Sequence, residues 1–219
     1  MMKKIAVLIL LNFLLLVCSN PAASHQPRII SEQKVEIKNP QISQAFYAVL
    51  QGTPDDYILK EEKEFPLYIS ILLPDLPEVR KDYLIEVYSF DNGNQLVPLF
   101  KLEGNHHTWE PFYEPFAGDT YLQGPESERV LPSGIYIIRV SNPDNQGKYV
   151  LSVGREESFS VPEAVDTIRN LPALKKYFGK SPFTAFFNLV GLFILMSLAV
   201  LAVVIFIAYR FIRYLLRQN

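Results

Sequence analysis

A run of 29 consecutive uncharged residues, residues 181–209, constrains this chain more than any other feature. Phe, Leu, Ile, Val and Ala dominate the run. Because a helix rises by about 1.5 Å per residue, one helix of this length is longer than the ~30 Å hydrocarbon core of a bilayer. Three arginines follow directly, as expected at a cytoplasmic end. The run therefore predicts one tilted C-terminal transmembrane α-helix over residues 181–209 and a short basic cytoplasmic tail over residues 210–219.

A second apolar run, residues 5–17, lies near the N-terminus behind two lysines and ahead of small residues that end at Ser24. This order predicts a signal peptide over residues 1–24. Two alternatives stay open, a lipid-modified Cys18 and an uncleaved membrane anchor. Export followed by stop transfer predicts a single-pass type I protein of the cell membrane. Its N-terminal body is then extracytoplasmic, its tail is cytoplasmic, and its C-terminal helix contacts membrane lipid.

Charge separates the body of the chain from its ends. All 23 acidic residues and 12 of the 21 basic residues lie in residues 28–166, so this stretch carries −11 although the whole chain carries only −2. A protein that binds nucleic acid needs a basic face to neutralise phosphates, so we expect no nucleic-acid partner. The 12 Tyr and 15 Phe residues supply enough apolar surface to exclude an intrinsically disordered chain.

Apolar residues alternate with polar ones across residues 25–160, a spacing typical of strands that are buried on one face. Turn residues such as Asn92-Gly93 and Pro132-Ser133-Gly134 separate the segments. The pattern predicts an all-β, antiparallel, jelly-roll-like β-sandwich as the ectodomain, residues 25–160. The expected strands cover residues 45–50, 57–59, 67–73, 83–90, 96–102, 135–140 and 149–153.

Residues 161–180 change character. Pro162 suits the first turn of a helix, and apolar residues after it recur on one face. We expect a connector of short juxtamembrane helices, interrupted at Pro172, whose lysines contact lipid head groups: Lys175, Lys176 and Lys180. A solvated linker is the alternative.

The closing hairpin combines Gly134-Ile135-Tyr136 with Tyr149-Val150-Leu151-Ser152-Val153, and alternate residues of each strand share one face. This pattern resembles the end of a bacterial pre-peptidase C-terminal (PPC) domain, and the resemblance extends over roughly residues 44–154. It implies a jelly-roll-like sandwich of a kind that usually accompanies a secreted peptidase and aids secretion or binds substrate. This chain departs from that arrangement because it has a membrane span and no peptidase.

Motifs of catalysis are absent from the sequence: no HExxH, GxSxG, P-loop or dinucleotide fingerprint occurs. The neighbours His106 and His107 would point to opposite faces of a strand, which does not suit one zinc ion. We therefore expect no enzyme.

Aromatic and acidic residues are densest in residues 103–126, whose prolines and glycines predict a long loop. Its aromatic side chains are a candidate partner or glycan surface: Trp109, Phe112, Tyr113 and Tyr121. Its carboxylates are a candidate calcium site: Glu110, Glu114 and Asp119. Alternatively, the aromatic rings plug the end of the sandwich and the acids face water.

These features favour a single-pass membrane-anchored extracytoplasmic module with a non-catalytic binding or interaction role toward a protein or glycan. A purely architectural envelope protein or spacer is the alternative, and calcium-stabilised glycan binding is a third reading. Apart from this calcium, no cofactor is expected.

Overall fold

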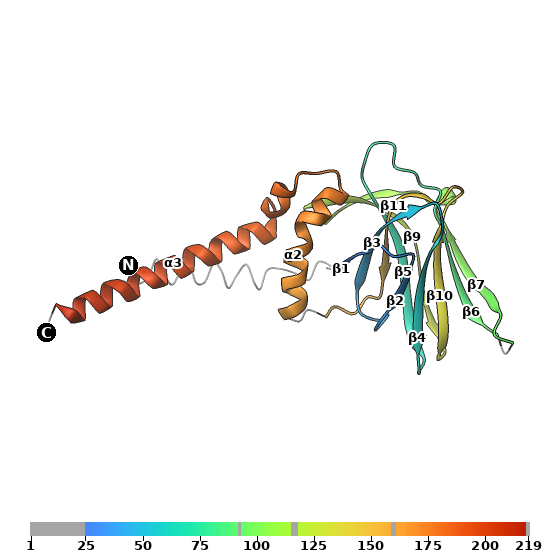
Figure 1. The fold of residues 1–219 in the computed structure, drawn as a ribbon, viewed down its shortest axis with the longest axis horizontal. Coiled ribbons are helices and arrows are strands. Elements are labelled where there is room, and N and C mark those ends of the chain that lie inside the picture. Colours follow the sequence, from blue (N-terminus) through green and yellow to red (C-terminus); the bar gives the residue numbers. More distant parts are fainter. Residues whose placement is uncertain (1–24, 92, 115–117, 159–160, 218–219) are drawn as a thin grey trace.

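The computed structural model describes residues 25–91, 93–114, 118–158 and 161–217. Two β-sheets pack face to face, and a long helix extends away from them (Figure 1). The signal peptide predicted over residues 1–24 lies outside the described residues and stays a prediction.

The first sheet has six strands, in the order β1 (Gln26–Ile29), β3 (Gln44–Gln51), β11 (Gln146–Val153), β5 (Phe65–Pro74), β9 (Asp119–Leu131) and β8 (Glu110–Glu114). The second has five, in the order β2 (Lys34–Ile37), β4 (Asp55–Glu61), β10 (Gly134–Ser141), β6 (Leu84–Phe90) and β7 (Leu96–Glu103). The predicted β-sandwich is thus confirmed. Two edge pairs, β1–β3 and β2–β4, are parallel, which was not expected, because alternation indicates the buried face of a strand but not its direction.

The core lies between the sheets and follows the predicted alternation. Tyr136, Ile138 and Val140 of β10 are buried, as are the alternate residues of β11 that begin with Tyr149. Tyr149 donates a hydrogen bond to Asp55 Oδ2 at 2.7 Å, and its hydroxyl lies 2.9 Å from that of Tyr57. The polar tips of these buried side chains are therefore paired with one another.

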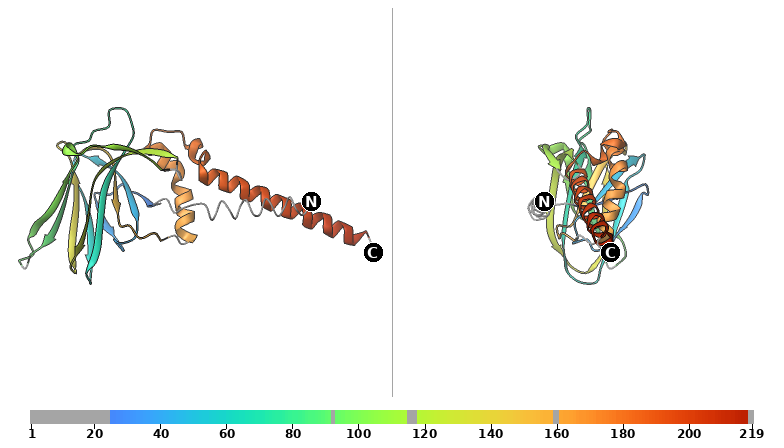
Figure 2. Two further views of the ribbon diagram at one scale, coloured as in Figure 1. Left: turned by 180° about the vertical axis from the view of Figure 1, so that it is seen from behind. Right: turned by 90° about the vertical axis from the view of Figure 1, so that its left-hand side faces the viewer.

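The connector is a docked helix. α2 (Val161–Tyr177) lies on the outer face of the six-stranded sheet (Figures 1 and 2), where Leu171 and Leu174 join a second apolar cluster with Tyr47 of β3. Tyr177 donates hydrogen bonds from its hydroxyl to two backbone carbonyls of the sheet. The predicted interruption at Pro172 was wrong: burial of leucines on both sides of the proline holds one continuous helix.

A 3-10 helix, η2 (Pro182–Phe186), joins α2 to the long helix α3 (Leu189–Leu216). In the described part of the chain, one segment is long and apolar enough to cross a membrane, Ile194–Tyr214, and none of it is buried. The helix begins later than the predicted residue 181, because the Asn188 side chain accepts a bond from Gly191 N and caps the first turn. An added Cβ at Gly191 would meet the Phe186 carbonyl, so this tight turn requires glycine.

Candidate functional site

The expected loop over residues 103–126 is mostly regular structure, which corrects the prediction. It contains η1 (Gly104–His106), β8 and the first half of β9. Pro111 is tolerated because β8 is an edge strand that pairs with β9 alone. Pro125 lies at a β-bulge, where the register between β5 and β9 shifts after Ser70. The prolines therefore led to a wrong prediction of a loop, because the sheet accommodates one at an edge strand and the other at a bulge.

Trp109 acts as a plug at one end of the sandwich. It is half-buried against the main core, and its indole Nε1 donates to the Gly104 carbonyl at 2.9 Å. Its ring lies over two glycines, since a Cβ added at Gly104 or Gly124 would come within 3.0 or 2.5 Å of ring atoms. This placement corresponds to the structural role that the sequence left open for the residue.

Asp119, at the start of β9, is fully buried and binds two lysines of the connector. Oδ2 accepts from Lys175 Nζ at 2.8 Å, and Oδ1 accepts from Lys180 Nζ at 2.7 Å. Lys175 is itself only 2% exposed. The expectation that Lys175 contacts lipid head groups was therefore wrong, because the buried carboxylate offers that ammonium a partner which no local pattern indicates.

The three candidate calcium ligands differ in environment. Glu110 is exposed on β8, and Glu114 lies at the other end of that strand opposite Asp119. Both oxygens of Asp119 already accept hydrogen bonds from ammonium groups. Among the described residues, no group of three or more His, Cys, Asp or Glu side chains could hold a metal ion. This arrangement therefore does not suit calcium, which needs six or more oxygen ligands.

The candidate aromatic surface is divided. Tyr121 is buried beneath α2, with its hydroxyl 2.6 Å from that of Tyr47 and its ring centroid 4.9 Å from that of Phe178. Burial raises the pKa of Tyr121 well above its ordinary value. Phe112 and Tyr113 are exposed on β8, at 40% and 60%. Of the four predicted aromatic residues, these two are the exposed ones.

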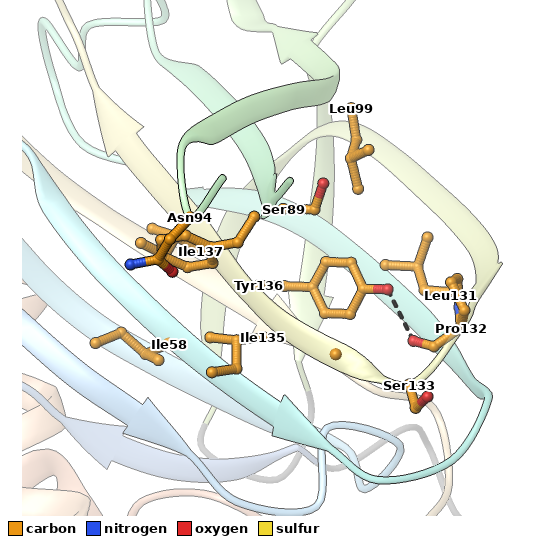
Figure 3. A pocket seen from close by; sticks show the side chains of 12 residues that line it. Ile58, Ser89, Asn94, Leu99, Leu131, Pro132, Ser133, Ile135, Tyr136 and Ile137 are labelled. Atoms are coloured by element: carbon orange, nitrogen blue, oxygen red, sulfur yellow. Dashed lines mark hydrogen bonds between the residues drawn. The ribbon is translucent and has the colours of Figure 1, made fainter. Parts of the chain in front are cut away.

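The five-stranded sheet carries an apolar groove that was not predicted from the sequence, and its lining joins side chains of the outer face to the buried Leu131 and Tyr136. The groove has a volume of about 570 Å³ and lies along β10 near its turn to β9. Figure 3 shows Ile58, Ile135 and Ile137 on one side of β10 and Tyr136 on the other, where its hydroxyl donates to the Pro132 carbonyl at 2.7 Å. The signal was present in β10, where both faces are apolar from Ile135 to Ile138.

Ion pairs border this groove. The Arg139 guanidinium donates two bonds to Asp56, at 2.7 and 2.8 Å, in the row of residues next to Ile58 and Ile137. The Asp56 carboxylate raises the pKa of Arg139 further. An apolar centre with a charged rim is the usual arrangement of a protein-binding surface.

The fold defines the class: a two-sheet β-sandwich followed by one apolar helix that could span a membrane. No protein-family model and no curated protein sequence matches the chain. Among solved structures, the chain is similar to the pre-peptidase C-terminal domain of a collagenase from Bacillus anthracis, with 13% identity and a TM-score of 0.32, over 60% of this chain and 95% of that one. It is also similar to a mitogen from Yersinia pseudotuberculosis, with 12% identity and a TM-score of 0.35, over 55% and 92%. The likeness to both structures concerns fold alone.

Proposed function

We propose that this protein is a single-pass membrane-anchored extracytoplasmic module without catalytic activity, and that it presents the outer face of its five-stranded sheet to a partner protein. α3 anchors the module, with the sandwich outside the cell membrane and the C-terminal end in the cytoplasm. This proposal keeps the binding role expected from the sequence and moves the contact surface from residues 103–126 to the groove at Ile58, Ile135 and Ile137.

One observation carries the proposal: the two outer faces of the sandwich differ. α2 covers the outer face of the six-stranded sheet and lies between that sheet and α3 (Figures 1 and 2). The five-stranded sheet lies on the far side of the sandwich from α3 (Figure 1). A membrane that holds α3 would therefore leave this second face open to the outside.

Side chains on the open face support a protein partner. Ile135 is 47% and Leu99 is 42% exposed, and both line the groove. In the register of the sheet, Ile137 lies between Ile58 and Tyr88, which makes a cross-strand apolar row. Apolar and aromatic side chains at the centre of a surface, with charged pairs around them, are the composition of binding hot spots.

Site-specific photocrosslinking in host cells tests this surface. A photoreactive amino acid at Ile135 should form a discrete crosslinked product, and Ile137→Asp should abolish it. Val49 is a matched control, because it is 39% exposed on β3 of the opposite sheet. Products of equal yield from residues 49 and 135 would contradict the proposed surface, provided that both variants keep the wild-type thermal stability.

Membrane orientation is tested separately with an impermeant maleimide on intact cells, in a chain whose Cys18 is replaced by alanine. Ser133→Cys should react from outside, whereas Arg217→Cys should react only after lysis. The reverse pattern would contradict the proposed topology.

A purely architectural spacer is the second candidate, and the position of Trp109 and Asp119 favours it. Both residues belong to the segment that was expected to bind a partner, yet both are engaged in holding the fold together. If residue 135 yields no crosslinked product in a folded and correctly oriented protein, the spacer role replaces the binding role.

A further inference from the structure

We propose that η2 and the β8–β9 hairpin form a second membrane contact beside α3, in which Phe183, Phe187 and Tyr113 enter the head-group region of the outer leaflet. The inference rests on the proposed anchoring by α3 and deepens it. The sandwich would then lie against the bilayer in a fixed orientation, and not at the end of a free stalk.

The depth of η2 follows from the position of the membrane-spanning segment. The candidate span begins at Ile194, and the helix begins at Leu189. At about 1.5 Å per residue, these five residues extend about 7 Å beyond the span. The polar layer on each side of the hydrocarbon core is roughly 5–7 Å thick. The chain folds back at the end of η2, where the Phe186 carbonyl lies against Gly191. Because Gly191 precedes the span by three residues, or about 4.5 Å, this end of η2 lies at the level of the head groups.

Phenylalanine rings at this level have little protein around them. Phe183 is 88% exposed and Phe187 is 85% exposed, and Phe186 between them is 47% exposed. In water, rings this exposed leave apolar surface unburied, at a cost of roughly 25 cal/mol per Å². Partition into the interface removes this cost, which makes lipid a suitable partner for η2.

The β8–β9 hairpin reaches the same level. A Cβ added at Gly118 would lie 3.2 Å from the Asn188 Cβ and 3.5 Å from the Tyr113 hydroxyl, so the described end of the hairpin touches the residue before α3. Lys180 Nζ also donates to the Gly118 carbonyl at 3.3 Å. In Figures 1 and 2 the hairpin extends from the sandwich to the connector beside the start of α3.

Tyr113 is suited to the interface by its chemistry. Its ring is 60% exposed, and a phenol places an apolar body and a polar tip at the boundary between acyl chains and head groups. Continuity decides the occupant: η2 and its C-cap Phe187 directly precede α3, whose exposed candidate span a bilayer would cover. The surface therefore extends the lipid contact of α3 along one edge of the six-stranded sheet.

The test uses the full chain, with Cys18 replaced by alanine, reconstituted in vesicles of phosphatidylcholine and phosphatidylglycerol. Single cysteines at Tyr113 and Phe183 carry an environment-sensitive fluorophore, and nitroxide lipids labelled at the head group or deep in the acyl chain act as quenchers. Val130→Cys is the matched control, because residue 130 is 64% exposed near the far end of β9. Leu201→Cys reports on the anchor itself, since it is 53% exposed within the candidate span.

We expect head-group nitroxide to quench labels at residues 113 and 183 and to leave the label at 130 unquenched, while the deep nitroxide quenches the label at 201. If 201 is quenched but 113 and 183 behave like 130, the second contact is refuted and the anchor stands. If 201 is not quenched, the anchor fails and the inference with it. A blue shift at 113 without quenching would assign the surface to a second copy or another protein, which also refutes it.

Discussion

Lys175 and Asp119 are 56 residues apart in the chain and form a buried ion pair with 2.8 Å between Nζ and Oδ2. The pair joins the connector helix to the hairpin that ends the six-stranded sheet. Lys180 binds the other carboxylate oxygen, so one acidic side chain holds both ends of the segment that leads to α3.

Removal of Lys175 should destabilise the protein strongly. Lys175→Met leaves the fully buried Asp119 with one cation, and breaking a buried pair in this way costs about 3 kcal/mol. Urea unfolding of the full chain in detergent, followed by fluorescence of its single tryptophan, measures the loss. Lys176→Met is the control, because the neighbouring Lys176 is exposed and should change the free energy of unfolding by less than about 0.5 kcal/mol.

The double variant Asp119→Asn with Lys175→Met should lose less stability than the sum of the single variants, because neither change then leaves an unpaired charge. Additive losses would show that the two side chains do not interact as the structure places them.

Trp109 should contribute to stability and not to partner capture. Trp109→Ala removes a half-buried ring from the end of the sandwich, and we expect a loss of about 2–3 kcal/mol, below the ~3–5 kcal/mol of a fully buried tryptophan. Thermal unfolding followed by circular dichroism measures this loss, and photocrosslinking from residue 135 measures capture. Capture lost with unchanged stability would restore the predicted contact surface at Trp109.

Gly124→Ala supplies an independent check on the same contact. Its new methyl group would stand 2.5 Å from the Trp109 ring, so the variant should be destabilised in the wild-type background. In the Trp109→Ala background the added cost should shrink, although a close approach of 2.7 Å to the Ile71 carbonyl remains. An equal cost in both backgrounds would place the tryptophan elsewhere.

Stability should fall as the medium is acidified below about pH 6.5, because of His25. Burial lowers the pKa of His25 from 6.5 to about 4, and its ring lies 2.5 Å from Ser43 Oγ. The unfolded chain thus binds a proton at a higher pH than the folded chain does. The contribution of neutral His25 to the free energy of unfolding is therefore complete above pH 6.5. Up to about 3 kcal/mol of this contribution is lost as the pH falls to 4.

Comparison with His25→Gln isolates this effect, because burial raises the pKa of Asp55 and gives a pH dependence of opposite sign. Urea unfolding at a series of pH values should give a smaller loss on acidification for the variant. Identical slopes for the two proteins between pH 6.5 and 4 would contradict the buried, neutral histidine.

Calcium should leave the melting temperature unchanged. The Asp119 oxygens are occupied by two lysines, and calcium could displace them only by leaving the buried Lys175 ammonium without its partner. Thermal scans of the full chain in detergent with calcium and with a chelator measure this directly. An upward shift with calcium, abolished by Glu110→Gln and Glu114→Gln, would restore the calcium hypothesis.

Much of the architecture could be predicted from local pattern. Alternation placed Tyr136 and Tyr149 on the buried faces of their strands, because successive side chains of a strand point to opposite sides. Length and hydropathy likewise indicated an apolar C-terminal helix. The candidate site was harder to predict from the sequence. Trp109, Tyr113 and Tyr121 are close in sequence, but they lie in three environments: a plug, an exposed edge and a buried cluster.

The sequence by itself determined which residues are apolar and at what period they recur, and this was sufficient for a β-sandwich and one long apolar helix. Only the tertiary structure decided that the connector docks on the six-stranded sheet, that Lys175 binds Asp119, and that the five-stranded sheet keeps an open face. The physical reason is the distance along the chain over which each effect acts. Periodicity acts over a few residues, whereas a buried ion pair depends on which distant segments burial brings together.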